Sequence, residues 1–132
     1  MRWQSIGMTR LALTLLLPAL AVLASCDTSP KPPGDIGVCY HYVTPKGQAP
    51  HFNVLARNVP SLEACAADLE AMRLHFVMLG GTQQELTGAY QSKFIFLQRE
   101  GVMVGDTLNG IRYTALVRSG GQLVLPGAVP QQ

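Results

Sequence analysis

The chain has 132 residues, with 10 lysines and arginines against 8 aspartates and glutamates. The basic residues are spread singly, so there is neither the basic stripe of a nucleic-acid-binding protein nor the polybasic cluster that binds anionic lipid. Arg2 and Arg10 both precede a long uncharged stretch. Without residues 1–25 the chain has 107 residues, eight basic and eight acidic, which is enough for one domain and too few for two.

The first 25 residues have the pattern of a secretory signal peptide. A basic start is followed by the uncharged stretch Leu11 to Ala24, which ends in small residues. A membrane-spanning helix needs about 20 apolar residues, and this stretch is shorter. We therefore expect residues 1–25 to be removed on export, with Met8 as an alternative start to Met1.

The uncharged stretch runs into Leu23-Ala24-Ser25-Cys26. This tetrapeptide resembles the lipobox of bacterial lipoproteins, in which a large aliphatic residue and two small ones precede an invariant cysteine. The resemblance implies that Cys26 is lipidated, that the leader is cut just before it, and that acyl chains such as palmitate hold the protein on the membrane. Each buried methylene adds about 0.8 kcal/mol, so two or more chains give durable attachment. Leader cleavage near Ala24 without lipid, or an uncleaved anchor, is the alternative.

Asp27 directly follows the expected lipidation site. In enterobacterial lipoproteins an aspartate at this position favours the inner membrane. The resemblance thus implies a lipid-anchored protein of the bacterial cell membrane that faces the periplasm, with the outer membrane as the alternative location. Residues 26–36 are rich in proline and glycine, which predicts an extended tether between lipid and domain.

Assigning Cys26 to lipid leaves Cys39 and Cys65 as a pair in an oxidising compartment, where disulfides persist. A bond between them would stabilise the fold by about 3–4 kcal/mol in the chain-entropy model. A metal site or a catalytic thiol is the alternative, but there is no CxxC motif and no second ligand pair nearby. The sequence therefore predicts a structural disulfide.

Six short segments are predicted to be strands, because they carry aromatic and β-branched residues or alternate apolar with polar positions. They cover residues 38–43, 52–57, 93–98, 102–104, 111–117 and 123–125. Strict alternation along the fifth segment would place Arg112 and Arg118 on one face of the sheet. Residues 82–91 are polar and give no clear prediction.

One helix is predicted between the second and third strands. Ser61 is the expected cap, and Gly80-Gly81 the expected stop. Apolar residues recur on one face of this helix at Leu62, Cys65, Leu69, Met72 and Phe76. The charged residues Glu63, Asp68, Glu70 and Arg73 are expected on a solvated face.

Together these elements predict an α+β domain over residues 37–125, followed by a flexible tail over 126–132. Its small antiparallel sheet should contain about four or five strands, in the chain order β-β-α-β-β-β. The helix should pack on one face, joined to the sheet by the disulfide.

The predicted disulfide also orients the first strand. Because Cys39 must point toward the helix, His41 and Val43 should do so as well, and Tyr40 and Tyr42 should point away. The run from Phe94 to Leu97 is apolar on both sides, as in a strand buried on both faces. The face that the helix leaves open thus offers a possible interaction surface, consisting of Tyr40, Tyr42, Phe94 and Phe96. Alternatively, the 82–91 loop or the C-terminal segment covers it.

The sequence contains no motif for catalysis or for metal binding. His41, His51 and His75 lack the spacing of metal ligands. We therefore expect no enzyme, cofactor or metal, and interpret the chain as a lipid-anchored interaction or assembly module with an envelope protein partner. The alternatives are a small-ligand binder or enzyme inhibitor that uses the loops 44–51 and 82–91, and an uncharacterised hydrolase.

Overall fold

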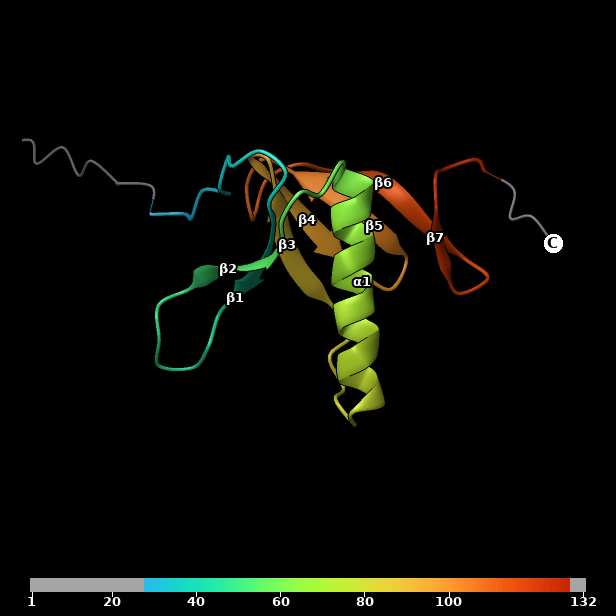
Figure 1. Cartoon of the computed structure of the whole chain (residues 1–132), viewed down its shortest axis with the longest axis horizontal. Coiled ribbons are helices and arrows are strands. Elements are labelled where there is room, and N and C mark those ends of the chain that lie inside the picture. Colours follow the sequence, from blue (N-terminus) through green and yellow to red (C-terminus); the bar gives the residue numbers. More distant parts are fainter. Residues whose placement is uncertain (1–27, 129–132) are drawn as a thin grey trace, which may run out of the picture.

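The computed structural model describes residues 28–128, in which one helix packs across one face of a seven-stranded sheet (Figure 1). The elements are β1 (Cys39–Val43), β2 (His51–Ala56), α1 (Leu62–Met78), β3 (Leu86–Tyr90), β4 (Lys93–Leu97), β5 (Gly101–Gly105), β6 (Arg112–Ser119) and β7 (Gln122–Val124). The strands are antiparallel, in the order β2-β1-β3-β4-β5-β6-β7. The α+β class, the antiparallel sheet and the helix agree with the prediction, but the expected four or five strands are too few.

The strand that the sequence pattern did not predict is β3, which lies inside the sheet between β1 and β4. It contains Gly88, a residue that strands generally disfavour. Here the glycine is required, because a Cβ atom would lie 2.4 Å from a methyl carbon of Leu69 in α1 and 2.6 Å from the carbonyl oxygen of Tyr40. Its absence lets the helix approach the sheet.

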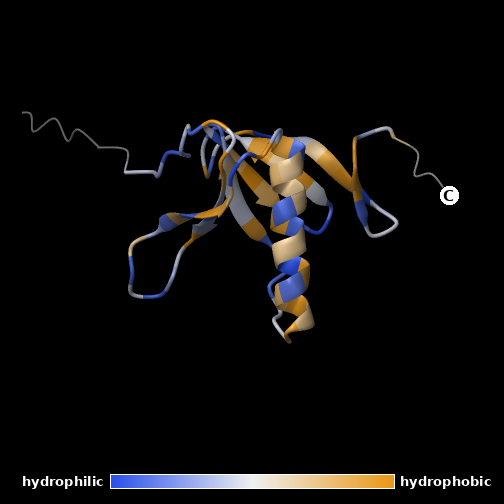
Figure 2. Cartoon of the chain, viewed as in Figure 1, coloured by the Kyte–Doolittle hydropathy of each residue, from blue (hydrophilic) through white to orange (hydrophobic). Residues whose placement is uncertain are grey.

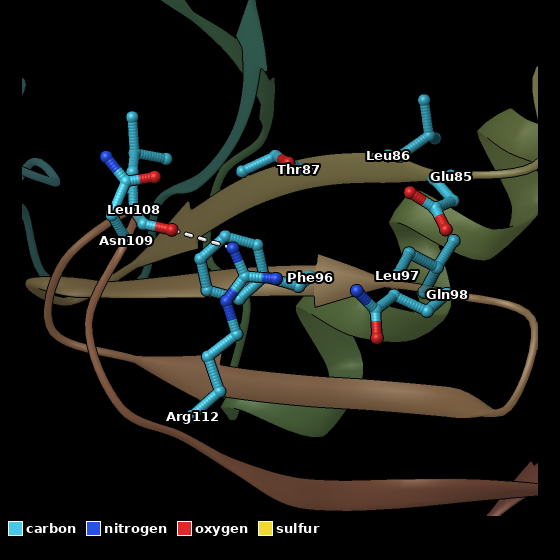
Figure 3. A pocket seen from close by; sticks show the side chains of 9 residues that line it. All are labelled: Glu85, Leu86, Thr87, Phe96, Leu97, Gln98, Leu108, Asn109 and Arg112. Atoms are coloured by element: carbon cyan, nitrogen blue, oxygen red, sulfur yellow. Dashed lines mark hydrogen bonds between the residues drawn. The ribbon is translucent and has the colours of Figure 1, made fainter.

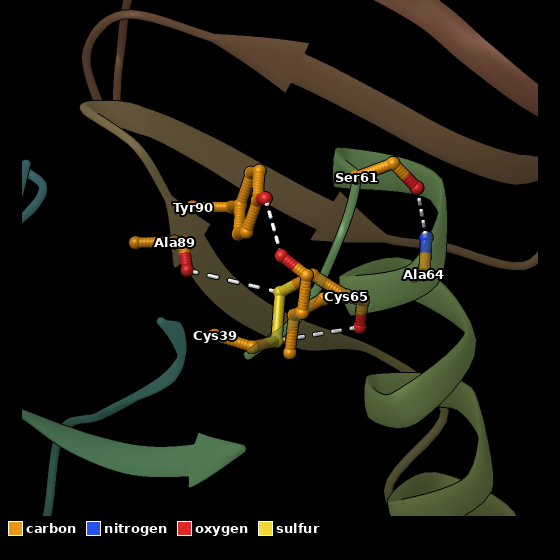
Figure 4. Close-up of a disulfide and its surroundings, with 7 residues drawn as sticks. Cys39, Ser61, Ala64, Cys65, Ala89 and Tyr90 are labelled. Atoms are coloured by element: carbon orange, nitrogen blue, oxygen red, sulfur yellow. Dashed lines mark hydrogen bonds between the residues drawn. A yellow bond between two sulfur atoms is a disulfide. The ribbon is translucent and has the colours of Figure 1, made fainter. Parts of the chain in front are cut away.

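The two ends of α1 form as their sequences predict. The Ser61 hydroxyl accepts a hydrogen bond from the backbone N–H of Ala64 at 3.1 Å, which satisfies one of the free donors of the first turn (Figure 4). At the other end, Leu79 caps the helix and Gly80 has φ +93°, a conformation that favours glycine.

The core lies between the sheet and the N-terminal half of α1. Its buried members are Cys39, Val59, Cys65, Ala66, Leu69, Leu86, Tyr90, Ile95, Leu97, Val102 and Leu116. Hydrophobic residues continue along α1 to its C-terminal end (Figure 2). That end extends past the sheet (Figure 1), so Phe76, predicted on the same buried face as Leu69, is half exposed.

A bulge separates the two arginines of β6. The pairing of β5 with β6 shifts register, and Ala115 is left without a partner strand residue. As a result Arg118 contacts Glu70 in α1, whereas Arg112 lies over the Phe96 ring on the opposite face. The prediction that both arginines share one face was therefore wrong.

Part of the predicted tether contacts the domain. The carbonyl oxygen of Pro33 accepts a hydrogen bond from the Ser92 N–H at 2.9 Å. The Gly37 N–H donates to the side chain of Gln91 at 3.1 Å, and the Gly37 carbonyl accepts from the Val59 N–H at 2.8 Å. From Pro33 onward, this segment therefore lies against the β3–β4 turn and the start of α1.

Candidate functional site

The predicted disulfide is present, whereas the predicted lipidation site Cys26 lies outside the described residues. Cys39 and Cys65 are bonded with their Cα atoms 5.3 Å apart, and both are fully buried (Figure 4). Beside them, the Tyr90 hydroxyl donates to the Val59 carbonyl at 2.7 Å. These contacts connect β1, β3 and the start of α1, so this end of the helix stabilises the fold.

The four aromatic residues of the predicted interaction surface lie mostly in the interior. Phe94, Phe96 and Tyr42 are 0%, 4% and 9% exposed, and Tyr40 is partly exposed. The rings pack in a row with Phe52: the centroid distances are 4.9 Å for Tyr42–Phe52, 6.0 Å for Phe52–Phe94 and 6.0 Å for Phe94–Phe96. Such pairs stabilise by about 0.5–1.5 kcal/mol beyond area burial. This row is a second core rather than an open surface.

A segment that follows β5 covers the end of this aromatic row. The guanidinium carbon of Arg112 lies 3.5 Å from the centroid of the Phe96 ring, and its Nη2 donates to the Leu108 carbonyl at 2.7 Å (Figure 3). A hollow of about 260 Å³ remains between these residues and the polar side chains of Glu85 and Asn109. The Arg112 guanidinium stacks on the Phe96 ring and is held there by its hydrogen bond to the Leu108 carbonyl, so it shields Phe96 from solvent.

The largest exposed apolar cluster on α1 is at its C-terminal end. Leu74, Phe76, Met78 and Leu79 are 46%, 49%, 82% and 75% exposed, and we call these four residues the helix-end patch. Exposed apolar residues that gather in one region of a surface mark interaction sites, whereas single ones are ordinary. The signal in the sequence is the run from Leu74 to Leu79, which is apolar at nearly every position. A helix that is covered on one face needs apolar residues only in a stripe along that face, so an apolar run on all sides exceeds what packing on the sheet requires.

A small pocket adjoins the helix-end patch. It measures about 140 Å³ and is lined by His41, Met72, Arg73, Phe76, Gln83 and Leu86. His41 thus points to the helix side of the sheet, as predicted. Burial lowers the pKa of His41, so its imidazole is neutral at pH 7. Phe76 belongs to both patch and pocket, and together these form the candidate site.

Next to this pocket, Glu70 joins the helix to the sheet. Its carboxylate accepts two hydrogen bonds from Arg73, both 2.9 Å, and two from Arg118, one of them 3.2 Å. The bonds from Arg73 first, then those from Arg118, outweigh burial and lower the Glu70 pKa to about 2. The prediction of a solvated Glu70 was wrong, because the bulge in β6 turns Arg118 toward the helix.

The three histidines do not converge. His41 lines the pocket, while His51 and His75 are exposed on β2 and on the last turn of α1. Within residues 28–128, no three His, Cys, Asp or Glu side chains are grouped closely enough to hold a metal ion. In the same part of the chain, no helix combines the length and the apolar character needed to cross a bilayer.

Comparisons with family models, with curated proteins and with solved structures gave no significant match.

Proposed function

We propose that this chain is a lipid-anchored module of the bacterial cell envelope that binds a protein partner through the helix-end patch. The observation that carries the proposal is the exposure of Phe76, Met78 and Leu79 at the end of a helix whose first half buries Cys65, Ala66 and Leu69. Interfaces are enriched in aromatic residues and methionine at their centres. The adjoining pocket gives such a partner a place to anchor.

The position of the patch supports a protein partner over a lipid surface. The described chain enters at the end where α1 begins, and the C-terminal end of α1 points the opposite way (Figure 1). The helix has 17 residues and is therefore about 25 Å long. With Cys26 acylated, the patch faces away from the membrane, toward the periplasm. Asp27 favours the inner membrane for this anchor.

The size of the adjoining pocket fits a side chain better than a free ligand. At about 140 Å³ it lies below the roughly 300–1,000 Å³ of small-molecule pockets. Met72 and Leu86 supply apolar walls, and the one charged residue of the lining, Arg73, is already paired with Glu70. An aliphatic or aromatic side chain of the partner would fill it and contact Phe76.

The test is co-purification of the full-length protein from its native membrane in mild detergent. The double variant Met78→Lys/Leu79→Lys should lose the partner without a fall in the thermal midpoint, because both side chains are exposed and cations are favourable at the C-terminal end of a helix. Ile111→Lys is the control, since Ile111 is 88% exposed but lies outside the patch, and it should retain the partner. Recovery of the wild type as a lone monomer, or equal loss in the control, would refute the proposal.

The anchor is tested separately. Cys26→Ala should abolish labelling by a fatty-acid analogue and release the protein into the soluble fraction. A variant that stays on the membrane would contradict the lipid anchor without affecting the proposed interface.

A second candidate function, small-ligand binding, is favoured by another depression. It measures about 540 Å³ and is lined by Tyr42, Thr44, Thr82, Gln83, Gln84, Glu85 and Thr87. Residues from both loops that the sequence suggested for a ligand take part in it. Native mass spectrometry of the purified protein would support this function if a small molecule remained bound and Thr87→Tyr removed it.

A further inference from the structure

A strongly basic hollow lies beside α1 on the side of the β4–β5 turn. It measures about 110 Å³, and its walls are Arg73, Gln84, Arg99 and Arg118. Three arginines therefore meet at one place in a chain whose charges are otherwise spread singly. No carboxylate lines the hollow, and Glu70 is the acid that the structure pairs with two of these arginines.

The hydrogen-bond capacity of Glu70 is already used. A carboxylate offers about four lone-pair sites, and Glu70 accepts two hydrogen bonds from Arg73 and two from Arg118. Each guanidinium has five N–H groups. Arg73 uses two of them on Glu70, and the exposed Arg99 guanidinium has no hydrogen bond or ion pair with residues 28–128. Donors around the hollow thus outnumber the acceptors that the described chain supplies.

Two of the three arginines are held in place. Arg118 donates to both oxygens of Glu70 and also to the carbonyls of Arg99, at 3.1 Å, and Gln98, at 3.3 Å. Arg73 is held by its two-point contact with Glu70. A ligand that binds here does not have to immobilise these side chains, which lowers the entropic cost of binding.

From this arrangement we propose that the hollow is a binding site for a single phosphate group, held by Arg73, Arg99 and Arg118. Guanidinium groups match phosphate oxygens in two-point hydrogen bonds. Three arginines and one carboxylate leave an excess of two positive charges, which complements the charge of about −1.5 to −2 on a phosphate monoester at pH 7. The hollow shares Arg73 with the small pocket beside Phe76 but contains no residue of the helix-end patch, and phosphate binding does not require the proposed partner.

The test is isothermal titration calorimetry of the full-length protein in a non-ionic detergent at low ionic strength, with inorganic phosphate as the probe. Wild type should bind one phosphate per chain, and Arg99→Ala should weaken binding about tenfold or more. The Arg99 side chain is exposed and makes no hydrogen bond or ion pair within residues 28–128, so this variant should fold normally. Arg57→Ala is the charge-matched control. Arg57 is exposed and follows β2, the edge strand of the sheet that lies away from β5 and β6.

The source of the phosphate group is distinguished by a second titration with water-soluble dibutyryl phosphatidylglycerol. Tighter binding of this headgroup than of inorganic phosphate assigns the site to a lipid, and weaker or equal binding assigns it to a soluble phosphate compound. Both results support a phosphate site. The absence of saturable binding to either probe, or equal weakening in Arg57→Ala and Arg99→Ala, would overturn it.

Discussion

The two halves of α1 share one apolar period but have different surroundings. In the N-terminal half, Cys65 is bonded to β1 and Leu69 is buried against Gly88. In the C-terminal half, Phe76 continues the same face and is half exposed, and Met78 is more exposed still. The difference arises because the sheet ends before the helix does. An amphipathic pattern therefore predicts which face of a helix can be buried. The length of the opposing sheet determines how much of that face is buried.

This contrast also separates stability from function within one element. Burying an apolar side chain of this size contributes about 1.5–3 kcal/mol, and the first half of α1 obtains that contribution. Side chains of the helix-end patch obtain little of it in the isolated chain. Substitutions in the first half should therefore change the free energy of unfolding, and substitutions in the second half should change binding.

The largest effect is expected at the disulfide. Replacing Cys39 and Cys65 by alanine should lower the free energy of unfolding by about 3–4 kcal/mol, since the bond closes a loop with a sequence separation of 26. Urea denaturation of the oxidised wild type and the double variant measures the difference. A loss below 1 kcal/mol would mean that the first half of the helix is held by packing alone.

Acidification should lower the free energy of unfolding by roughly 3 kcal/mol, because Glu70 becomes protonated. Its folded pKa of about 2 lies below the ordinary 4.5, so the unfolded chain takes up the proton first as the pH falls. This contribution is fully present above pH 4.5 and is lost between about pH 4.5 and 2. Urea denaturation at pH 6 and pH 2.5 should show a smaller pH dependence in Glu70→Gln than in the wild type. Equal dependence in both proteins would show that Glu70 does not couple helix to sheet.

A smaller effect, about 1 kcal/mol, is expected for Ser61→Ala. This variant removes the oxygen that accepts the Ala64 N–H and leaves that donor without its cap. Thermal unfolding followed by circular dichroism should show the loss, and Ser61→Asp should restore the stability because aspartate also caps. If both variants match the wild type, the start of α1 is fixed by the disulfide and not by its cap.

The smallest effect on stability is expected in the helix-end patch. Met78→Ser should change the free energy of unfolding by no more than about 0.5 kcal/mol, because the side chain is 82% exposed. The same substitution should weaken co-purification of the partner. A loss of stability comparable with that of the disulfide variant would show that the C-terminal half of α1 is part of the core.

Local signals in the sequence were sufficient for the elements that follow local rules. The aromatic and β-branched residues of β1 and β4 predicted strands, and Ser61 and Gly80 predicted the limits of the helix. The disulfide was predicted because assigning Cys26 to lipid left the other two cysteines as a pair. Each of these conclusions depends on residues that are close in sequence or on the number of cysteines.

The features that were missed depend on contacts between distant segments. The interior position of β3 gives Gly88 its role against Leu69, and propensity alone argues against a strand there. The Glu70–Arg118 pair exists because of the unpaired Ala115, and a bulge leaves little trace in a short alternating segment. Half-exposure of Phe76 depends on where the sheet ends. The disulfide was therefore predictable, whereas the sequence shows only the apolar run of the candidate site and gives no indication of the basic hollow.

The contact between Pro33 and Ser92 has a mechanical consequence for an acylated protein. Six residues separate Cys26 from Pro33, and the seven steps between their Cα atoms span at most about 25 Å. The domain would then act as a short arm that holds its far end within a narrow range of heights above the bilayer. Confinement of this kind raises the effective concentration of a membrane-bound partner that displays its surface at the same height, and disfavours partners that do not.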